Sequence, residues 1–64
     1  MTDNKRFFVV VDETLMRCID ASNVGKVHQF FTAADVPYRL ITRNEYMAAK
    51  AAKQYRQGQY VKLS

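Results

Sequence analysis

An unbroken run of aromatic and β-branched residues predicts a strand at residues 6–11. After Arg6 this segment is entirely aromatic or β-branched, and its odd and even positions are both apolar. A strand with two apolar faces has to be covered on both sides, so we expect it at the centre of the sheet. Residues 38–41 predict a further strand, because Pro37 disfavours helical backbone at the residue before it and so ends the preceding helix.

Residues 14–20 fit two patterns. Leu15 and Ile19 have helical spacing, but the alternation along this segment also fits a strand. We favour the strand, joined to the first one by a tight turn at Asp12 and Glu13. The helix remains open, because this turn lacks the Asn-Gly or Asp-Gly pair that two-residue hairpin turns prefer.

A helix is predicted over residues 23–34, with Ser22 as its N-cap. Apolar side chains recur along it at helical spacing and form one stripe, which consists of Val24, Val27, Phe31 and Ala34. This stripe is the face that we expect to pack on the sheet.

A second helix is predicted from the capping-box sequence that begins at Thr42 and ends at Glu45. Because the segment is rich in alanine, we expect the helix to reach about Gln57 and to stop at Gly58. One face would then be basic, with Arg43, Lys50, Lys53 and Arg56. The opposite face would be apolar but shallow, with Met47, Ala48, Ala51, Ala52 and Tyr55.

Together these elements predict one α+β domain over residues 1–64. Its core is a small antiparallel sheet in ββαβ order over residues 5–41, followed by the basic amphipathic helix over residues 42–58. Residues 1–4 are expected to form a flexible lead, and residues 59–64 a short edge strand or a tail.

The positive charge is confined to the second half of the chain. Residues 1–32 hold four basic and four acidic side chains, whereas residues 33–64 hold six basic and two acidic ones, which accounts for the formal net charge of +4. The C-terminal part should therefore attract an anionic partner.

Catalytic chemistry has little support in the sequence. Cys18 and His28 are the only cysteine and the only histidine, and nothing places them together as a nucleophile and its base or as a metal site. The two glycines do not form a phosphate-binding loop. We therefore expect no enzyme, no cofactor and no metal. The single cysteine and the lack of a membrane span or signal peptide favour a soluble cytoplasmic protein.

Two binding functions remain. The first is a regulatory protein that binds an acidic protein surface through the aromatic and arginine side chains around one strand-to-helix corner, namely Tyr38, Arg39, Arg43 and Tyr46. The alternative is nucleic-acid binding by the basic helix and nearby tyrosines, namely Arg43, Lys50, Lys53, Tyr55, Arg56 and Tyr60. A homodimer is also left open, because so short a chain has a small core.

The order strand, strand, helix, strand over residues 5–41, opening on Lys5 and Phe7, resembles phage-encoded accessory proteins that bind and inhibit host machinery, including inhibitors of bacterial RNA polymerase. This resemblance concerns the order of the elements and carries no site residue. It implies a protein-binding regulator.

Overall fold

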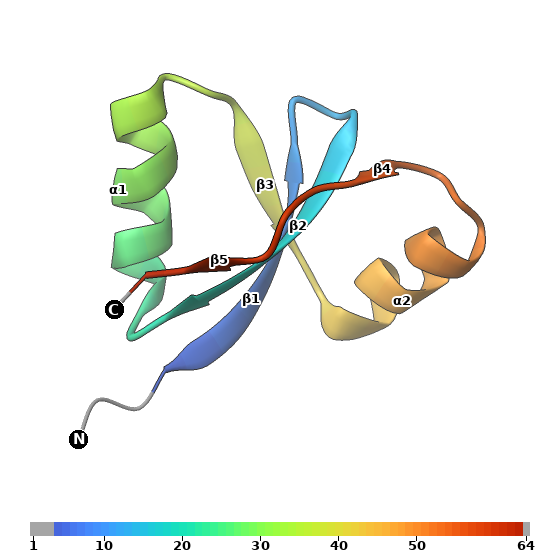
Figure 1. The fold of residues 1–64 in the computed structure, drawn as a ribbon, viewed down its shortest axis with the longest axis horizontal. Coiled ribbons are helices and arrows are strands. Elements are labelled where there is room, and N and C mark those ends of the chain that lie inside the picture. The colour runs from blue at the N-terminus through green and yellow to red at the C-terminus, as the bar shows by residue number, and fades with distance from the viewer. Residues whose placement is uncertain (1–3, 64) are drawn as a thin grey trace.

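The computed structural model describes residues 4–63 and shows a mixed five-stranded sheet with two helices (Figure 1). In chain order the elements are β1 (Lys5–Val11), β2 (Leu15–Ala21), α1 (Val24–Ala34), β3 (Tyr38–Ile41), α2 (Arg43–Ala51), β4 (Arg56–Gln57) and β5 (Val61–Lys62). The α+β class is thus confirmed. Most of the predicted lead, residues 1–3, lies outside the described residues.

The three strands within residues 5–41 pair antiparallel, as predicted, but β4 and β5 make the sheet as a whole mixed. The strand order is β3-β1-β2-β4, and β5 also pairs with β2. Both β2 and β3 run antiparallel to β1, whereas β4 and β5 run parallel to β2. The returning chain covers the outer edge of β2: the Arg56 N–H donates to the Thr14 carbonyl at 3.0 Å, and the Gly58 N–H donates to the Met16 carbonyl at 2.7 Å.

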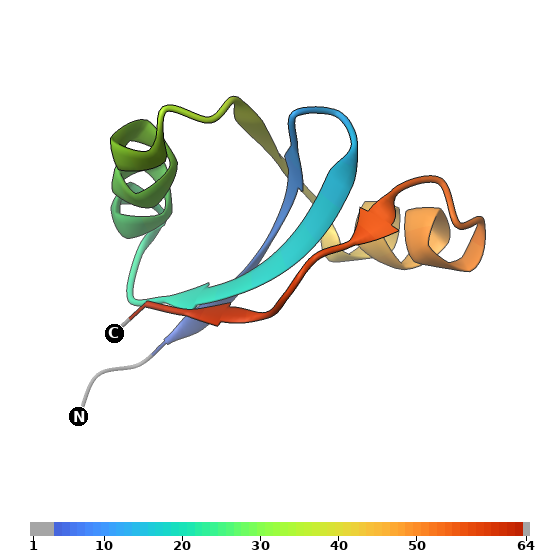
Figure 2. The ribbon, with the colours of Figure 1, turned by 45° about the horizontal axis from the view of Figure 1, so that its top comes forward.

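β1 is central and covered on both faces, as its sequence predicts. Val9 is 0% exposed and packs in a cluster with Val27 and Phe31 of α1, whereas Val10 is 1% exposed and packs with Tyr46 of α2. The two helices therefore cover opposite faces of the sheet, and Figure 2 shows them on either side of the β1–β2 hairpin. Odd positions of β1 face α1 and even positions face α2.

The predicted strand is present as β2 over Leu15–Ala21, so the helical interpretation of residues 14–20 is wrong, and Thr14 belongs to the turn. The hairpin turn is tight, with the Thr14 N–H donating to the Val11 carbonyl at 3.1 Å. Asp12 and Glu13 both have a φ of 52°, the left-handed backbone that matches the twist of a hairpin. For residues other than glycine this conformation costs about 1–2 kcal/mol each.

α1 begins one residue later than predicted. Its N-cap is Asn23, whose Oδ1 accepts a hydrogen bond from the Lys26 N–H at 3.1 Å. Asparagine and serine cap helices equally well, so sequence alone does not separate Asn23 from Ser22. Within the predicted stripe Val27 and Phe31 are buried, while Val24 and Ala34 are exposed.

α2 starts at the predicted capping box. The Glu45 N–H donates to Thr42 Oγ1 at 3.0 Å, and the Thr42 N–H donates to Glu45 Oε1 at 3.1 Å. Its predicted end at Gln57 is wrong, because the helix stops at Ala51 and Lys53 turns the chain with a φ of 53°. Residues 56–57 instead hydrogen-bond to the open edge of β2, which satisfies backbone groups on both strands.

Gly58 allows close approach to β2 and does not end a helix. A Cβ atom at this position would lie 2.7 Å from Arg17 Cγ and 2.7 Å from Leu15 Cδ2. The early end of α2 also breaks up the predicted basic face, because Lys53 lies in the turn and Arg56 in β4. Residues 59–64 were expected as an edge strand or a tail, and Val61–Lys62 forms the edge strand β5. Within the described part of the chain, both helices are too short and polar to span a membrane.

Candidate binding groove

A hollow of about 770 Å³ lies between α2 and the face of the β1–β2 hairpin that α2 covers. The alternation of the strands brings its residues together: Arg6 and Phe8 are even positions of β1, and in the register they lie opposite Asp20 and Cys18 of β2. We call this hollow the basic groove. It is lined by Asn4, Arg6, Phe8, Cys18, Asp20, Arg43, Tyr46, Met47 and Lys50.

The floor of the basic groove is aromatic. The rings of Phe8 and Tyr46 pack with their centroids 4.6 Å apart, and Tyr46 is only 6% exposed. The Tyr46 hydroxyl accepts a hydrogen bond of 2.7 Å from Gln57 Nε2, which links β4 to α2. The floor is therefore held by contacts on both sides and is part of the core.

The rim on α2 combines two cations and one apolar side chain. Arg43, Met47 and Lys50 follow one another along one side of the helix at about one turn each. Met47 is 48% exposed, which is high for so large an apolar side chain. Within residues 4–63 neither Arg43 nor Lys50 forms an ion pair, so both cations are available to a ligand.

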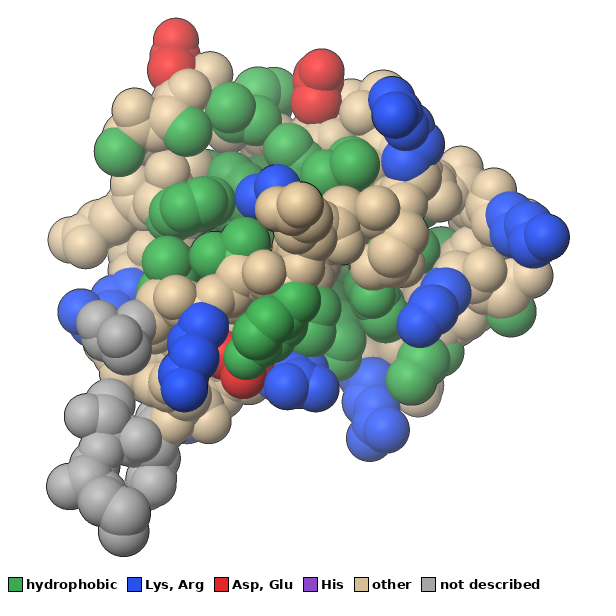
Figure 3. Space-filling view, in the orientation of Figure 1, with side chains coloured by type: hydrophobic (Ala, Val, Ile, Leu, Met, Phe, Trp, Pro, Cys, Tyr) green, Lys and Arg blue, Asp and Glu red, His purple; other side chains and the backbone are tan. Residues whose placement is uncertain are grey.

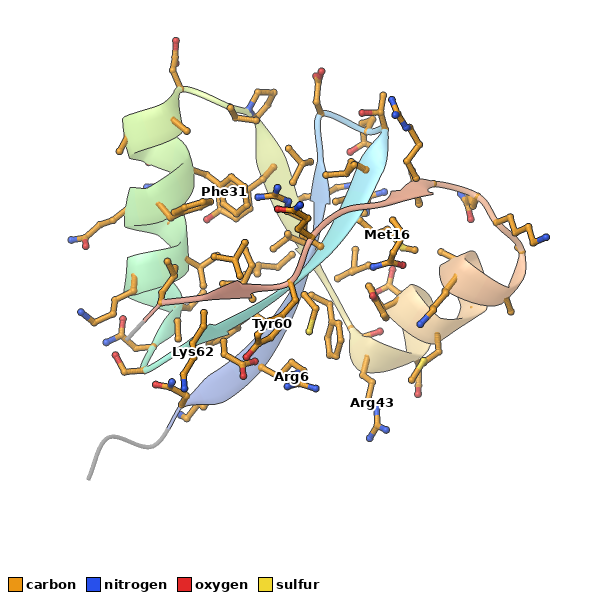
Figure 4. The ribbon with its side chains drawn as sticks, viewed as in Figure 1. Arg6, Met16, Phe31, Arg43, Tyr60 and Lys62 are labelled. Carbon is orange, nitrogen blue, oxygen red and sulfur yellow. The ribbon has the colours of Figure 1, made fainter. Side chains whose placement is uncertain are left out.

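The opposite end of the groove holds a linked set of charged and aromatic groups. Arg6 Nε donates to Asp20 Oδ1 at 2.9 Å, and the Arg6 guanidinium lies 5.5 Å from the centre of the Tyr60 ring. The Tyr60 hydroxyl also donates to Asp20. Arg6 above all, and then Tyr60, hold the pKa of Asp20 below its usual value. Figure 4 shows Arg6, Tyr60 and Lys62 together near β5, with Arg43 beyond them at the start of α2.

The charge on this side of the molecule is unevenly distributed. Asp20 is ionised at neutral pH, but its charge is matched by Arg6, so Arg43 and Lys50 leave the groove with a net positive charge. Figure 3 shows lysine and arginine side chains along the side of β5 and α2. Acidic side chains are visible at the opposite end, near the hairpin turn and the end of α1, and one more lies among the basic side chains near β5. An anionic ligand would therefore approach the groove side.

Cys18 and His28 lie on opposite faces of the sheet. Cys18 lies in the basic groove opposite Phe8, and partial burial raises the pKa of its thiol. His28 is on α1, where its Nδ1 lies 3.1 Å from the Tyr38 hydroxyl. The structure therefore does not bring the two together as a nucleophile and its base. In the described part of the chain, no group of three or more metal-ligating side chains forms.

The predicted protein-contact residues are divided between the two faces. Tyr38 stacks on Phe31 of α1 with the ring centroids 4.5 Å apart. Arg39, one position further along β3, points to the other face. There its Nε donates to Glu13 Oε2 at 2.6 Å and its Nη2 to the Tyr55 hydroxyl at 3.0 Å.

Of the four predicted protein-contact residues, the structure brings only Arg43 and Tyr46 together, and both line the basic groove.

The predicted nucleic-acid residues are also dispersed. Arg43 and Lys50 lie in the basic groove, but Lys53 and Arg56 lie beyond the end of α2. Tyr55 is half-buried and Tyr60 is 52% exposed, with Arg6 over its ring.

Sequence reasoning missed Arg6, Phe8 and Met47. Arg6 and Phe8 are two residues apart on a predicted strand, so their side chains lie on the same face and are neighbours. Because both faces of this strand are apolar further along, the sequence does not show which element covers that face. That they face α2 follows only from the tertiary structure. Comparison with protein-family models, with curated proteins and with solved structures finds no match to this chain.

Proposed function

We propose that the protein is a non-catalytic binding module that takes an acidic, partly apolar segment of a partner protein into the basic groove. The observation that carries this proposal is the stripe of Arg43, Met47 and Lys50 on α2, in which an exposed apolar side chain lies between two cations that form no ion pair with any residue of 4–63. Such a combination matches a segment with an apolar anchor between acidic residues.

The two parts of this surface would have different roles. Arg43 and Lys50 would attract the acidic segment and orient it, which mainly raises the association rate. Met47 and the edge of Phe8 would bury an apolar side chain of the partner, which mainly slows dissociation. Methionine suits this role because its flexible side chain adapts to different partners.

A protein partner fits the groove better than single-stranded nucleic acid. Bases bind by stacking on free aromatic faces. Phe8 and Tyr46 already pack against each other, and the Tyr60 ring carries Arg6 on one side. The cations alone would suit phosphates equally well, so nucleic-acid binding stays as the alternative that the experiment has to separate.

The test uses a fluorescein-labelled amphipathic peptide with leucines on one helical face and glutamates beside them, and a twin peptide with glutamine in place of glutamate. We expect the acidic peptide to bind and the glutamine twin to bind at least about 5-fold more weakly. Lys50→Gln should weaken binding of the acidic peptide by about 3- to 10-fold. Lys53→Gln is the matched control, because it removes the same charge outside the groove.

Equal effects of Lys50→Gln and Lys53→Gln would contradict the proposed site. An oligothymidine titration run in parallel at two salt concentrations addresses the alternative, because phosphate contacts release counterions and make affinity fall steeply with salt. If the oligonucleotide binds more tightly than the acidic peptide and is lost at high salt, nucleic acid is the ligand and the proposed function is wrong.

A further inference from the structure

Among residues 4–63, no strand pairs with the outer edge of β3. β4 and β5 cover the outer edge of β2, whereas β3 pairs only with β1. The Asp12 N–H donates to the Pro37 carbonyl at 2.9 Å, which fixes the alternation of this antiparallel ladder. Arg39 and Ile41 therefore direct their backbone groups toward β1, and Tyr38 and Leu40 direct theirs away from the sheet.

Both ends of this open edge are already closed by other contacts. On one side the Val36 N–H donates to the Phe31 carbonyl at 3.1 Å. On the other side the Thr42 N–H donates to the Glu45 carboxylate at 3.1 Å, and the Thr42 carbonyl accepts from the Tyr46 N–H at 2.9 Å. Within β3, the backbone groups that remain open on this edge are those of Tyr38 and Leu40.

Leu40 adds an apolar side chain to this edge. It is 46% exposed and packs in neither core cluster, although its register partner Val9 is fully buried. An exposed leucine beside open N–H and carbonyl groups is the arrangement that strand addition uses.

We propose that a second copy of this chain adds its own β3 to this edge in the antiparallel direction, which makes the protein a weak homodimer. In the register centred on Arg39, Tyr38 of each copy faces Leu40 of the other. The backbone N–H of each of these residues donates to the carbonyl of the residue that it faces. All the open backbone groups are then paired, and each Leu40 packs against a tyrosine ring.

A second copy fits because the two open residues, Tyr38 and Leu40, lie on either side of Arg39. In an antiparallel pair centred on Arg39, Tyr38 of one copy therefore meets Leu40 of the other. The register also brings the two Arg39 side chains together on the other face of the sheet. Each Arg39 already binds its own Glu13 at 2.6 Å, and this contact keeps the pKa of Glu13 below its usual value. At neutral pH the two pairs are therefore neutral overall, and the contact carries no net repulsion.

The size of the edge sets the strength of the dimer. Four residues of strand extend over about 13 Å, and their pairing buries far less than the about 800 Å² per partner of a standard interface. We therefore expect a dissociation constant between about 10 µM and 1 mM. This surface is separate from the basic groove, and its test does not depend on the proposed function.

The test is sedimentation equilibrium with the whole chain from about 20 µM to 2 mM, combined with amide hydrogen exchange. We expect the fraction of dimer to rise across this concentration range, and the Tyr38 and Leu40 amides to exchange more slowly as the dimer forms. Since the chain is short enough for chemical synthesis, an N-methyl group on Leu40 can remove the outward N–H alone. This change should weaken the dimer by about 10-fold or more, because one hydrogen bond per copy is lost.

A second variant tests the charge arrangement. Glu13→Gln leaves each Arg39 without its carboxylate, so the dimer should weaken and added salt should partly restore it. A chain that stays monomeric at about 2 mM with its native circular dichroism would overturn the proposal. So would a dimer that N-methylation of Leu40 leaves unchanged, or one whose protected amides lie outside β3.

Discussion

Gly58 lies close to the side chains of Leu15 and Arg17, and adding one methyl group there tests how the C-terminal segment is held. In Gly58→Ala the new Cβ would lie 2.7 Å from Arg17 Cγ and 2.7 Å from Leu15 Cδ2. Gly58 does not have a positive φ, so alanine fits the backbone conformation. Any loss of stability would therefore come from the crowding of β2 and not from backbone strain.

The size of the effect follows from two opposing contributions. Overpacking of a well-packed site costs about 1–3 kcal/mol. Replacing glycine with alanine also restricts the unfolded chain, which stabilises the protein by about 0.4–1 kcal/mol. We therefore expect Gly58→Ala to lower the free energy of unfolding by about 1–2 kcal/mol, a large share of what a domain of this size has.

The assay is urea unfolding followed by circular dichroism, with the matched substitution Gly25→Ala as the control. A Cβ at Gly25 meets only Asn23 Oδ1, at 3.0 Å, in the exposed first turn of α1. With a slope of about 1 kcal/mol/M, Gly58→Ala should shift the urea midpoint down by about 1–2 M. Gly25→Ala should leave the midpoint unchanged or raise it by up to about 1 M, because alanine favours the helix.

Local exchange distinguishes crowding at β4 from a general loss of stability. The Gly58 and Arg56 amides donate to β2 and should exchange faster in Gly58→Ala, ahead of the amides of β1. If both alanine variants shift the urea midpoint equally, or if Gly58→Ala has no effect, then Gly58 does not lie as close to β2 as the structure shows.

Three further changes have definite expected outcomes. Asp12→Gly should stabilise the protein by about 0.5–1 kcal/mol in thermal unfolding, because glycine adopts the φ of 52° without strain. Tyr46→Phe removes the hydroxyl that accepts from Gln57 and should cost about 1 kcal/mol in urea unfolding, with no further loss when Gln57 is also changed to alanine. Arg6 is the main cause of the lowered pKa of Asp20. The ionised carboxylate therefore stabilises the fold at pH values above the ordinary aspartate pKa, and this contribution is lost as the pH falls. Asp20→Asn should make the free energy of unfolding less dependent on pH in the acid range.

The parts of the fold that follow from the sequence are those that local chemistry determines. The strand over residues 6–11 has apolar side chains on both faces, and this alone requires a central position. The capping box of Thr42 and Glu45 is made by side chains three residues apart, so no distant contact is needed to form it.

The end of α2 was not predictable in the same way. Alanine, lysine and glutamine favour a helix through Gln57. The chain leaves the helix because β2, which is distant in sequence, has an open edge, and because Gln57 reaches back to the Tyr46 hydroxyl of α2. The predicted basic face depended on the longer helix and is lost with it.

The residues of the basic groove could likewise be predicted only in part from the sequence. The excess of cations after residue 33 was visible in the sequence, and Arg43 and Lys50 come from it. Arg6 and Phe8 come from a half of the chain with no net charge, and only the pairing of β1 with β2 and the position of α2 bring them into the groove.

The most direct test of the basic groove is an NMR titration of the labelled protein with the acidic amphipathic peptide, followed at the Met47 methyl group and at the backbone amides. We expect the largest shifts at Met47, with shifts at Phe8 and Lys50 and none on the exposed side of α1. Shifts that are confined to α1, or a Met47 methyl that stays in place while the peptide binds, would show that the partner binds elsewhere.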